Sequence, residues 1–564
     1  MKSESEQRDD IYRIGVEDFL IALAAGNLEG GAAGRSIIVQ GSVDLRGHPL
    51  GVEIREIPKV AITGDLIADH TCALRTCRCK VAGKVTLDGS PIEEFSDHQV
   101  YAGKAGTVGG MFSARECMRL RRISGKFNND VDLAGSGVED VGVDFSCSGE
   151  LGLQGCAKLR KVDCIAWSIN ADGSSLTQIG PNTVAENLSV ANCSSLEEAT
   201  PVNGLTWAKY DGSGIREVPP SFQCNGPVYF NGCKKLRSLS GRMLTVEVSM
   251  ARLDRVADLE AEEIIFSNCA KVPESMTGIK TNAICFEQCG IEKFPGGTPE
   301  GASVRALGCR RFSQLPVVWR GSISLTDLPS LIETPEGFRC GKNLDVEDCP
   351  NLTRLRGKIG GDLWMLSGVG RLHELGGDLQ VGGDLTISVL SEVQRLSCRV
   401  GKDVVAGRSQ VRETGEKFSV GGDADLHGCK KLSAVRGKVG GMTMLDESAV
   451  QAIGADFECG GDLCVRGTEK LVSLNCSVGG RVLAGNSSLR RTGPAFRCAG
   501  NLNIAGCERF ETSQGMVGGR MRRGKRGGAG VGVKAAEKRA ELKKAGRVYP
   551  TESFAPGAKL GRGK

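Results

Sequence analysis

The stretch Ala424-Asp-Leu-His-Gly-Cys429-Lys-Lys-Leu432 decides the fold, because its pattern recurs along most of the chain. The pattern is φ-x-φ-x-x-Cys-x-x-φ, where φ is an apolar residue. Close copies are Leu151–Leu159, Val228–Leu236, Leu344–Leu352 and Leu502–Phe510. The Cys position, called the slot below, falls at residues 117, 156, 193, 233, 269, 309, 349, 390, 429, 468 and 507, with Leu at 390 and Thr at 468. Successive slots are therefore about 39 residues apart.

A second unit, with Ser in the slot, lies between many of these segments. It is found at Ser136, Ser174, Ser213, Ser409, Ser448 and Ser487. The basic coil is therefore about 20 residues long, and about 24 coils fit between Ser36 and Gly519. One coil cannot bury its apolar face alone, whereas stacked coils share a continuous core. We predict a β-rich solenoid of parallel strands with few helices, arranged in a 39-residue super-repeat.

Within a coil, the φ-x-φ stretch is expected to be a short strand, and the slot points inward. Gly-Gly pairs such as Gly360-Gly361 and Gly440-Gly441 stand just before strands. Because Gly adopts positive φ without steric cost, we expect positive φ at these corners. No 3.6-residue apolar period is visible between the strands, so the rest of each coil is expected to consist of loops and turns.

These segments resemble the highly structured part of a leucine-rich repeat over roughly residues 36–519. The 20-residue length is similar to the short bacterial class of type III secretion effectors. The Leu-Pro dipeptide of that class occurs only at Leu315-Pro316 and Leu328-Pro329, and no catalytic domain follows the repeats. The resemblance implies a bacterial effector that is secreted and binds a host protein, with a secretion signal in residues 1–10. A straight β-solenoid is the structural alternative.

The two ends of the chain differ from the repeats. Residues 1–35 form an N-terminal segment in which residues 10–23 carry apolar side chains at helical spacing, typical of a capping helix. Residues 520–564 hold 14 Lys or Arg and 3 Asp or Glu, a net charge of +11. Since the whole chain carries +5, the rest carries 5 − 11 = −6. We expect 36–519 to be the solenoid and 520–564 a disordered basic tail, with a short helix over 533–545.

The 23 cysteines are expected to be buried thiols. Cys-type slots lie on every second coil, about 10 Å apart, which is too far for a disulfide. Nine residues before the slot, some repeats carry Cys and others carry Val. A Cys that Val can replace acts as a small apolar side chain that fills the core. This predicts folding in a reducing, cytoplasmic compartment. His70, Cys72, Cys77 and Cys79 have ligand types that suit zinc, but Cys77 falls in a core position, and we expect no metal or cofactor.

Basic residues recur two positions after the slot. They are Arg119, Lys158, Lys235, Lys271, Arg311, Lys431, Lys470 and Arg509. Repetition on every second coil aligns them along one edge, which is a candidate binding surface for an acidic partner. The competing interpretation is a solvated edge whose charges prevent aggregation. In the tail, Arg522, Arg523, Lys525 and Arg526 are candidate electrostatic contacts.

The sequence contains no P-loop, no nucleophile elbow and no His-Glu-x-x-His motif. It also contains no apolar run long enough to span a membrane and no secretory signal layout at its start. We therefore expect a non-enzymatic scaffold with a protein partner and no small-molecule substrate. The alternative is binding of nucleic acid or an anionic surface through the tail and the cationic edge. A carbohydrate-active β-helix with paired carboxylates is a third hypothesis.

Overall fold

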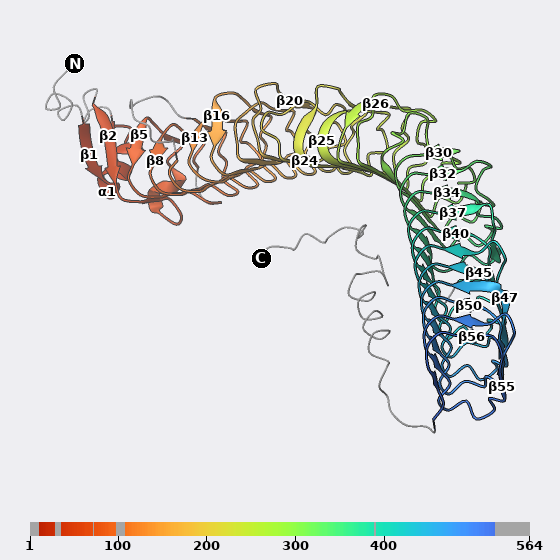
Figure 1. Cartoon of the computed structure of the whole chain (residues 1–564). Helices are drawn as coiled ribbons and strands as arrows, with labels where there is room; N and C mark the ends of the chain where they lie inside the picture. Colours follow the sequence, from red (N-terminus) through yellow and green to blue (C-terminus); the bar gives the residue numbers. More distant parts are fainter. Residues whose placement is uncertain (1–10, 29–34, 71–72, 97–107, 389–390, 525–564) are drawn as a thin grey trace, which may run out of the picture. The chain divides into compact units, whose positions relative to one another are not determined.

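The computed structural model describes residues 11–28, 35–70, 73–96, 108–388 and 391–524 (Figure 1). The chain forms a parallel β-solenoid of about 24 turns, about 20 residues apart, and only 3% of it is helical. This confirms the predicted fold class. The solenoid divides into two compact units, Met1–Val405 and Ala406–Lys564. Residues 1–10, Cys72 and the tail from Lys525 onward, including Arg526, lie outside the described residues.

Each turn contributes strands to as many as three parallel stacks, here called the main sheet, the second stack and the third stack. The main sheet contains the φ-x-φ strands. In the first unit these are β3 (Val43–Asp44), β6 (Leu66–Ile67), β9 (Val85–Thr86), β11 (Phe112–Ser113), β14 (Val131–Asp132), β17 (Glu150–Gly152), β19 (Ser168–Asn170), β21 (Asn187–Ser189), β22 (Trp207–Lys209), β24 (Gln223–Asn231), β25 (Ser238–Ser249), β27 (Glu263–Ser267), β28 (Ala283–Glu287), β29 (Ser303–Leu307), β31 (Ile323–Thr326), β33 (Leu344–Glu347), β35 (Leu363–Met365), β38 (Leu385–Ile387) and β41 (Val404–Val405). In the second unit they are β44 (Ala424–Asp425), β46 (Thr443–Met444), β48 (Leu463–Cys464), β51 (Val482–Leu483), β54 (Leu502–Asn503) and β57 (Met521–Arg522).

The second stack follows the slot. It contains β4 (Glu56–Ile57), β7 (Thr76–Cys77), β10 (Glu94–Phe95), β12 (Arg122–Ile123), β15 (Asp140–Val141), β18 (Lys161–Val162), β20 (Gln178–Ile179), β23 (Glu217–Val218), β26 (Arg255–Glu260), β36 (Glu374–Leu375) and β39 (Arg395–Leu396). In the second unit it contains β42 (Glu413–Thr414), β45 (Ala434–Val439), β47 (Ala452–Cys459), β49 (Ser473–Leu474), β52 (Arg491–Thr492) and β55 (Thr512–Ser513). The predicted loops on this side are thus partly short strands.

The third stack precedes the main sheet. Its strands are β1 (Ile11–Gly15), β2 (Ser36–Gln40), β5 (Val60–Ile62), β8 (Lys80–Val81), β13 (Gly125–Phe127), β16 (Phe145–Cys147), β30 (Val318–Trp319), β32 (Arg339–Cys340), β34 (Gly357–Ile359), β37 (Leu379–Val381) and β40 (Arg399–Val400). The second unit adds β43 (Ser419–Val420), β50 (Ser477–Val478), β53 (Arg497–Cys498) and β56 (Met516–Val517). The last strand, β57, ends three residues past the predicted solenoid limit at Gly519 and pairs in parallel with β54.

The slot residues form a buried ladder, as predicted. The hydroxyl of Ser136 lies 3.6 Å from the thiol of Cys156 on the next turn, and Ser213 lies 3.5 Å from Cys233. The Cys156 thiol also donates to the carbonyl oxygen of Leu133, 3.2 Å away. Alternation of Ser and Cys therefore satisfies both polar groups inside an apolar core.

Positive φ lies at a different corner from the one predicted. Gly360, Gly361, Gly440 and Gly441 do not have positive φ, whereas Gly155, directly before a slot, has a φ of +66°. The expectation for the Gly-Gly pairs is wrong, and the reason is packing. A Cβ on Gly360 would lie 2.9 Å from the carbonyl carbon of Gly341 on the preceding turn. These pairs let the backbones of successive turns approach closely.

The N-terminal segment contains a strand and a helix where the sequence predicted one helix over 10–23. Ile11–Gly15 form β1, which pairs in parallel with β2, and α1 spans only Val16–Ala24. The strand forms because Ile11 finds a partner at Ser36, a contact distant in sequence. The helix buries Phe19 and Leu20 and packs against β1, β2 and the 3₁₀ helix η1 (Pro49–Val52), at the N-terminal end of the solenoid (Figure 1).

Candidate functional site

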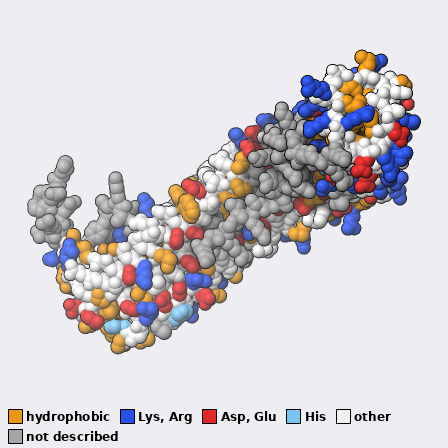
Figure 2. Space-filling view, turned by 60° about the horizontal axis from the view of Figure 1, so that its bottom comes forward, with side chains coloured by type: hydrophobic (Ala, Val, Ile, Leu, Met, Phe, Trp, Pro, Cys, Tyr) orange, Lys and Arg blue, Asp and Glu red, His pale blue; other side chains and the backbone are white. Residues whose placement is uncertain are grey.

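All eight residues of the predicted cationic edge are exposed. In the first unit, three of them have partners. Lys271 Nζ lies 2.6 Å from Asp254 Oδ1, Arg311 pairs with Glu292, and Lys235 Nζ donates to the Ser194 carbonyl oxygen at 3.5 Å. The edge there is partly neutralised, and Figure 2 shows Lys and Arg mixed with Asp and Glu over the visible surface.

In the second unit the edge holds Lys431, Lys470 and Arg509, on alternate turns. Within the part of the chain that the structure describes, these three form no ion pair. Arg119 and Lys158 of the first unit likewise form no ion pair among the described residues, so unpaired positive charge remains on both units. An exposed row of this kind attracts anions over a distance of about 10 Å at moderate salt.

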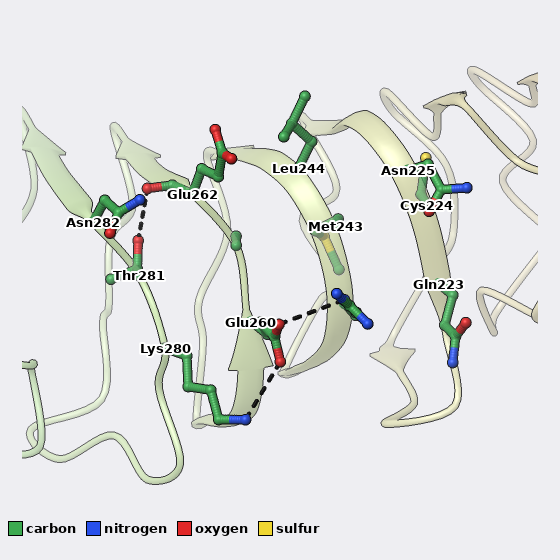
Figure 3. A pocket seen from close by; sticks show the side chains of 12 residues that line it. Gln223, Cys224, Asn225, Met243, Leu244, Glu260, Glu262, Lys280, Thr281 and Asn282 are labelled. Carbon is green, nitrogen blue, oxygen red and sulfur yellow. Dashed lines mark hydrogen bonds and ion pairs between the residues drawn. The ribbon is translucent and has the colours of Figure 1, made fainter.

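A groove that sequence reasoning missed crosses four successive turns of the first unit (Figure 3). Its cavity volume is about 400 Å³. The lining residues are Gln223, Cys224, Asn225, Arg242, Met243, Leu244, Glu260, Ala261, Glu262, Lys280, Thr281 and Asn282. They lie where the third stack passes into the main sheet.

The groove exists because the turns are shorter here. Cys224 is in register with Met243, and Val228 with Val246. Four positions separate Cys224 from Val228, but only three separate Met243 from Val246, so the corner loses one residue. The Gly-Gly pair that precedes the main-sheet strand in other turns is absent here. β25 is therefore one continuous strand of 12 residues that belongs to all three stacks. A one-residue deletion against the repeat is the signal that could have located this site.

The charged side chains in the groove form a short ladder. Arg242 Nε lies 3.5 Å from Glu260 Oε1, and Lys280 Nζ lies 3.4 Å from Glu260 Oε2 (Figure 3). On the other side, the Thr281 hydroxyl donates to the Glu262 carbonyl oxygen at 3.1 Å. Leu244 is 40% exposed beside them. The groove thus offers one exposed apolar side chain, near Glu262, and a separate ladder of charges of both signs at Glu260 (Figure 3).

The outward face of the main sheet carries carboxyls with raised pKa values, among them Asp345, Glu347 and Glu247. Burial and the neighbouring Glu347 raise the pKa of Asp345 to about 6, against the opposing effects of Arg305 and a hydrogen bond from Ser324. Burial also raises the pKa of Glu347. Asp345 and Glu347 are both half-buried on this face.

The thiols are free, as predicted. The 22 cysteines in the described ranges form no disulfide, and 20 of them are buried. Burial raises the pKa of Cys117 and Cys340 to about 11, so these thiols stay protonated at neutral pH.

Of the candidate zinc ligands His70, Cys72, Cys77 and Cys79, the structure describes His70, Cys77 and Cys79. The Cys77 and Cys79 thiols are buried, 2.9 Å apart. Cys72 lies outside the described residues, and the described residues hold no group of three or more His, Cys, Asp or Glu placed to bind a metal ion.

The tail candidates are only partly described. Arg522 ends β57 and is exposed, and Arg523 follows it at the end of the described chain. Among the described residues, no helix is long and apolar enough to cross a membrane.

The geometry defines a repeat protein of the β-solenoid class. No family model matches the chain, and no curated protein matches it.

Proposed function

We propose that this protein is a non-enzymatic scaffold that binds a protein partner. A solenoid presents an extended surface made of nearest-neighbour turns, which suits binding to a large partner. The resemblance to the short leucine-rich repeats of secreted bacterial effectors extends the proposal. On that basis the chain folds in a reducing cytoplasm, is secreted, and binds a host protein. The buried free thiols are consistent with folding in a reducing compartment.

The observation that carries the proposal is the groove of Figure 3. Protein interfaces combine an apolar centre with a polar rim that supplies direct hydrogen bonds. Leu244 provides an exposed apolar side chain, and Arg242, Glu260 and Lys280 supply charged groups elsewhere in the groove. The groove also interrupts an otherwise regular repeat, so it differs locally from the other turns.

The test is a pull-down from candidate host lysate with the full chain at low and moderate salt. Leu244→Asp places a charge in the groove, and Ile332→Asp is the matched control, because Ile332 is 58% exposed in the same unit. The proposal expects a partner that survives moderate salt with the native chain and Ile332→Asp but does not bind Leu244→Asp. Retention by Leu244→Asp removes the groove as the binding surface.

The second candidate function is binding of nucleic acid or another anionic surface. It is favoured by Lys431, Lys470 and Arg509, which form no ion pair among the described residues, and by the basic composition of 520–564. Its affinity falls steeply with salt. A plot of log affinity against log salt concentration has a negative slope. Replacing Lys431 and Lys470 by Glu should make this slope less steep by about 1 for each phosphate group that the variant no longer neutralises. A slope unchanged in this variant excludes the edge as the binding surface.

A further inference from the structure

The last turn of the second unit places a cation where other turns place an apolar core residue. Met521 of β57 is in register with Leu502 of β54. Two positions further on, Arg523 therefore corresponds to Ile504, which is only 4% exposed. The guanidinium carbon of Arg523 lies 5.0 Å from the centre of the Phe510 ring, within the range of a cation–π contact. The inward position of the final turn is thus occupied by a charge over an aromatic ring.

A cavity of about 550 Å³ opens beside this contact. Its apolar walls are Ile504, Cys507 and Phe510, and Arg523 and Glu508 stand at its rim. Cys507 and Phe510 are only half-buried, unlike their counterparts Cys429 and Leu432. Among the residues that the structure describes, these two side chains are thus less covered than their counterparts within the solenoid.

Further arginines lie on the last turns of the second unit, outside the lining of the cavity. Arg509, Arg520 and Arg522 are exposed and form no ion pair within the described ranges. The acidic residues nearby are Glu508 and Glu511. Figure 2 shows Lys and Arg gathered around an exposed apolar patch at one end of the molecule. Arg509, Arg520, Arg522 and Arg523 together with Ile504, Cys507 and Phe510 are called the end face below.

The charge of the end face selects among its conceivable occupants. Residues 525–564 of the same chain carry 11 Lys or Arg and 3 Asp or Glu, so the tail is repelled by the arginines. The same face of a second copy is repelled as well. A ligand with carboxylates is complementary, because guanidinium groups bind carboxylates with charge-assisted hydrogen bonds.

We propose that the end face binds an acidic segment of a partner protein. An apolar side chain of that segment enters the cavity against Ile504, Cys507 and Phe510, and a neighbouring carboxylate pairs with Arg523, the one arginine that lines the cavity among the described residues. The end face would be a second binding surface of the scaffold. This proposal rests on the proposed function in one respect, which is that the ligand is a protein. The basic tail adds long-range attraction for the same ligand.

The test uses the full chain and a fluorescein-labelled peptide of glutamates with one central leucine, measured by fluorescence anisotropy. Arg523→Glu should weaken binding about tenfold, as expected when roughly one charge-assisted hydrogen bond is removed. Lys431→Glu is the matched control, because it makes the same change in net charge on the side of the same unit. It should leave the affinity within about twofold. Replacing the leucine of the peptide by serine should weaken binding about fivefold, since one apolar side chain no longer enters the cavity. Circular dichroism verifies that both variants are folded.

Four outcomes overturn the proposal. One is an equal loss of affinity with Lys431→Glu, which indicates attraction to net charge alone. A second is equal affinity for the leucine and serine peptides. A third is binding by a chain ending at Gly524 but not by the full chain, which places the tail on the end face. The fourth is Arg523-dependent binding to vesicles of phosphatidylcholine and phosphatidylserine with no binding of the peptide, which identifies a lipid surface instead. Leu244→Asp should bind the peptide like the native chain, so failure of this proposal and failure of the groove are separate results.

Discussion

Replacing Gly360 by Ala tests whether the Gly-Gly corners are required for close packing. Gly360 lies at the end of β34, and its N–H donates to the Cys340 carbonyl oxygen at 2.7 Å. An added methyl carbon would lie 2.9 Å from the Gly341 carbonyl carbon and closer still to its oxygen. Backbone atoms held in such ladders cannot yield without breaking hydrogen bonds.

The expected loss of stability follows from two opposing effects. Overpacking against a fixed neighbour costs about 1–3 kcal/mol, and contact with backbone puts Gly360→Ala at the upper end, about 3 kcal/mol. Reduced freedom of the unfolded chain offsets this by about 0.4–1 kcal/mol. We therefore expect a net destabilisation of about 2 kcal/mol.

Two matched variants separate packing from backbone conformation. Gly301→Ala has nothing within 4 Å and no positive φ, so it should be neutral or slightly stabilising. Gly155→Ala also has open space but a φ of +66°, so it should cost about 1 kcal/mol. Urea denaturation followed by circular dichroism measures all three. A loss of stability for Gly360→Ala no larger than that for Gly155→Ala would refute the packing argument.

Three further predictions concern other parts of the chain. Because the folded-state pKa of Asp345 is raised from 3.8 to about 6, its stabilising contribution is present below about pH 4 and is lost as the pH rises through 6. Asp345→Asn should therefore abolish a fall of about 3 kcal/mol in unfolding free energy over that range, and an unchanged pH profile contradicts this. Added dithiothreitol should leave the melting temperature unchanged, because the described cysteines are free thiols; a lower melting temperature with reductant reveals a disulfide. Phe19→Ala should lower the free energy of unfolding by about 3–5 kcal/mol, because the Phe19 side chain of α1 is fully buried. The first turns should then be cleaved in limited proteolysis, and native protease resistance contradicts a capping role.

The repeat itself could be predicted from the sequence because its signal is local and periodic. The φ-x-φ strand and the slot lie within nine residues of one another, as in Ala424–Leu432. The slot lies beyond the strand, after a turn, and its inward position was indicated by the recurrence of small Cys and Ser residues there; the buried Ser136–Cys156 contact confirms it. The free state of the thiols also followed from the spacing of the turns.

The features that were missed depend on contacts between turns. Two-residue strands such as β12 are too short to show an alternation of apolar and polar residues. The sequence therefore gives no pattern from which the second stack could be predicted. Ile11–Gly15 carry a helical apolar spacing but become a strand because β2 pairs with them. The Gly-Gly pairs face the carbonyl groups of the preceding turn, which a single coil does not reveal.

The functional features were harder to predict, since they arise where the repeat is altered. The groove depends on one residue missing between Met243 and Val246 relative to the preceding corner. The raised pKa of Asp345 depends on its burial and on side chains from neighbouring turns, such as Arg305 and Ser324, which a single coil does not reveal. The cationic edge was predicted as a uniform row, whereas Asp254 and Glu292 neutralise part of it in the first unit.

The central claim is that a protein partner binds the groove of the first unit. The most direct measurement is photo-crosslinking from the full chain with p-benzoylphenylalanine at position 244, compared with the same group at position 332. We expect one host protein crosslinked from position 244 at moderate salt and none from position 332. Equal crosslinking from both positions, or no protein product from position 244, would contradict it.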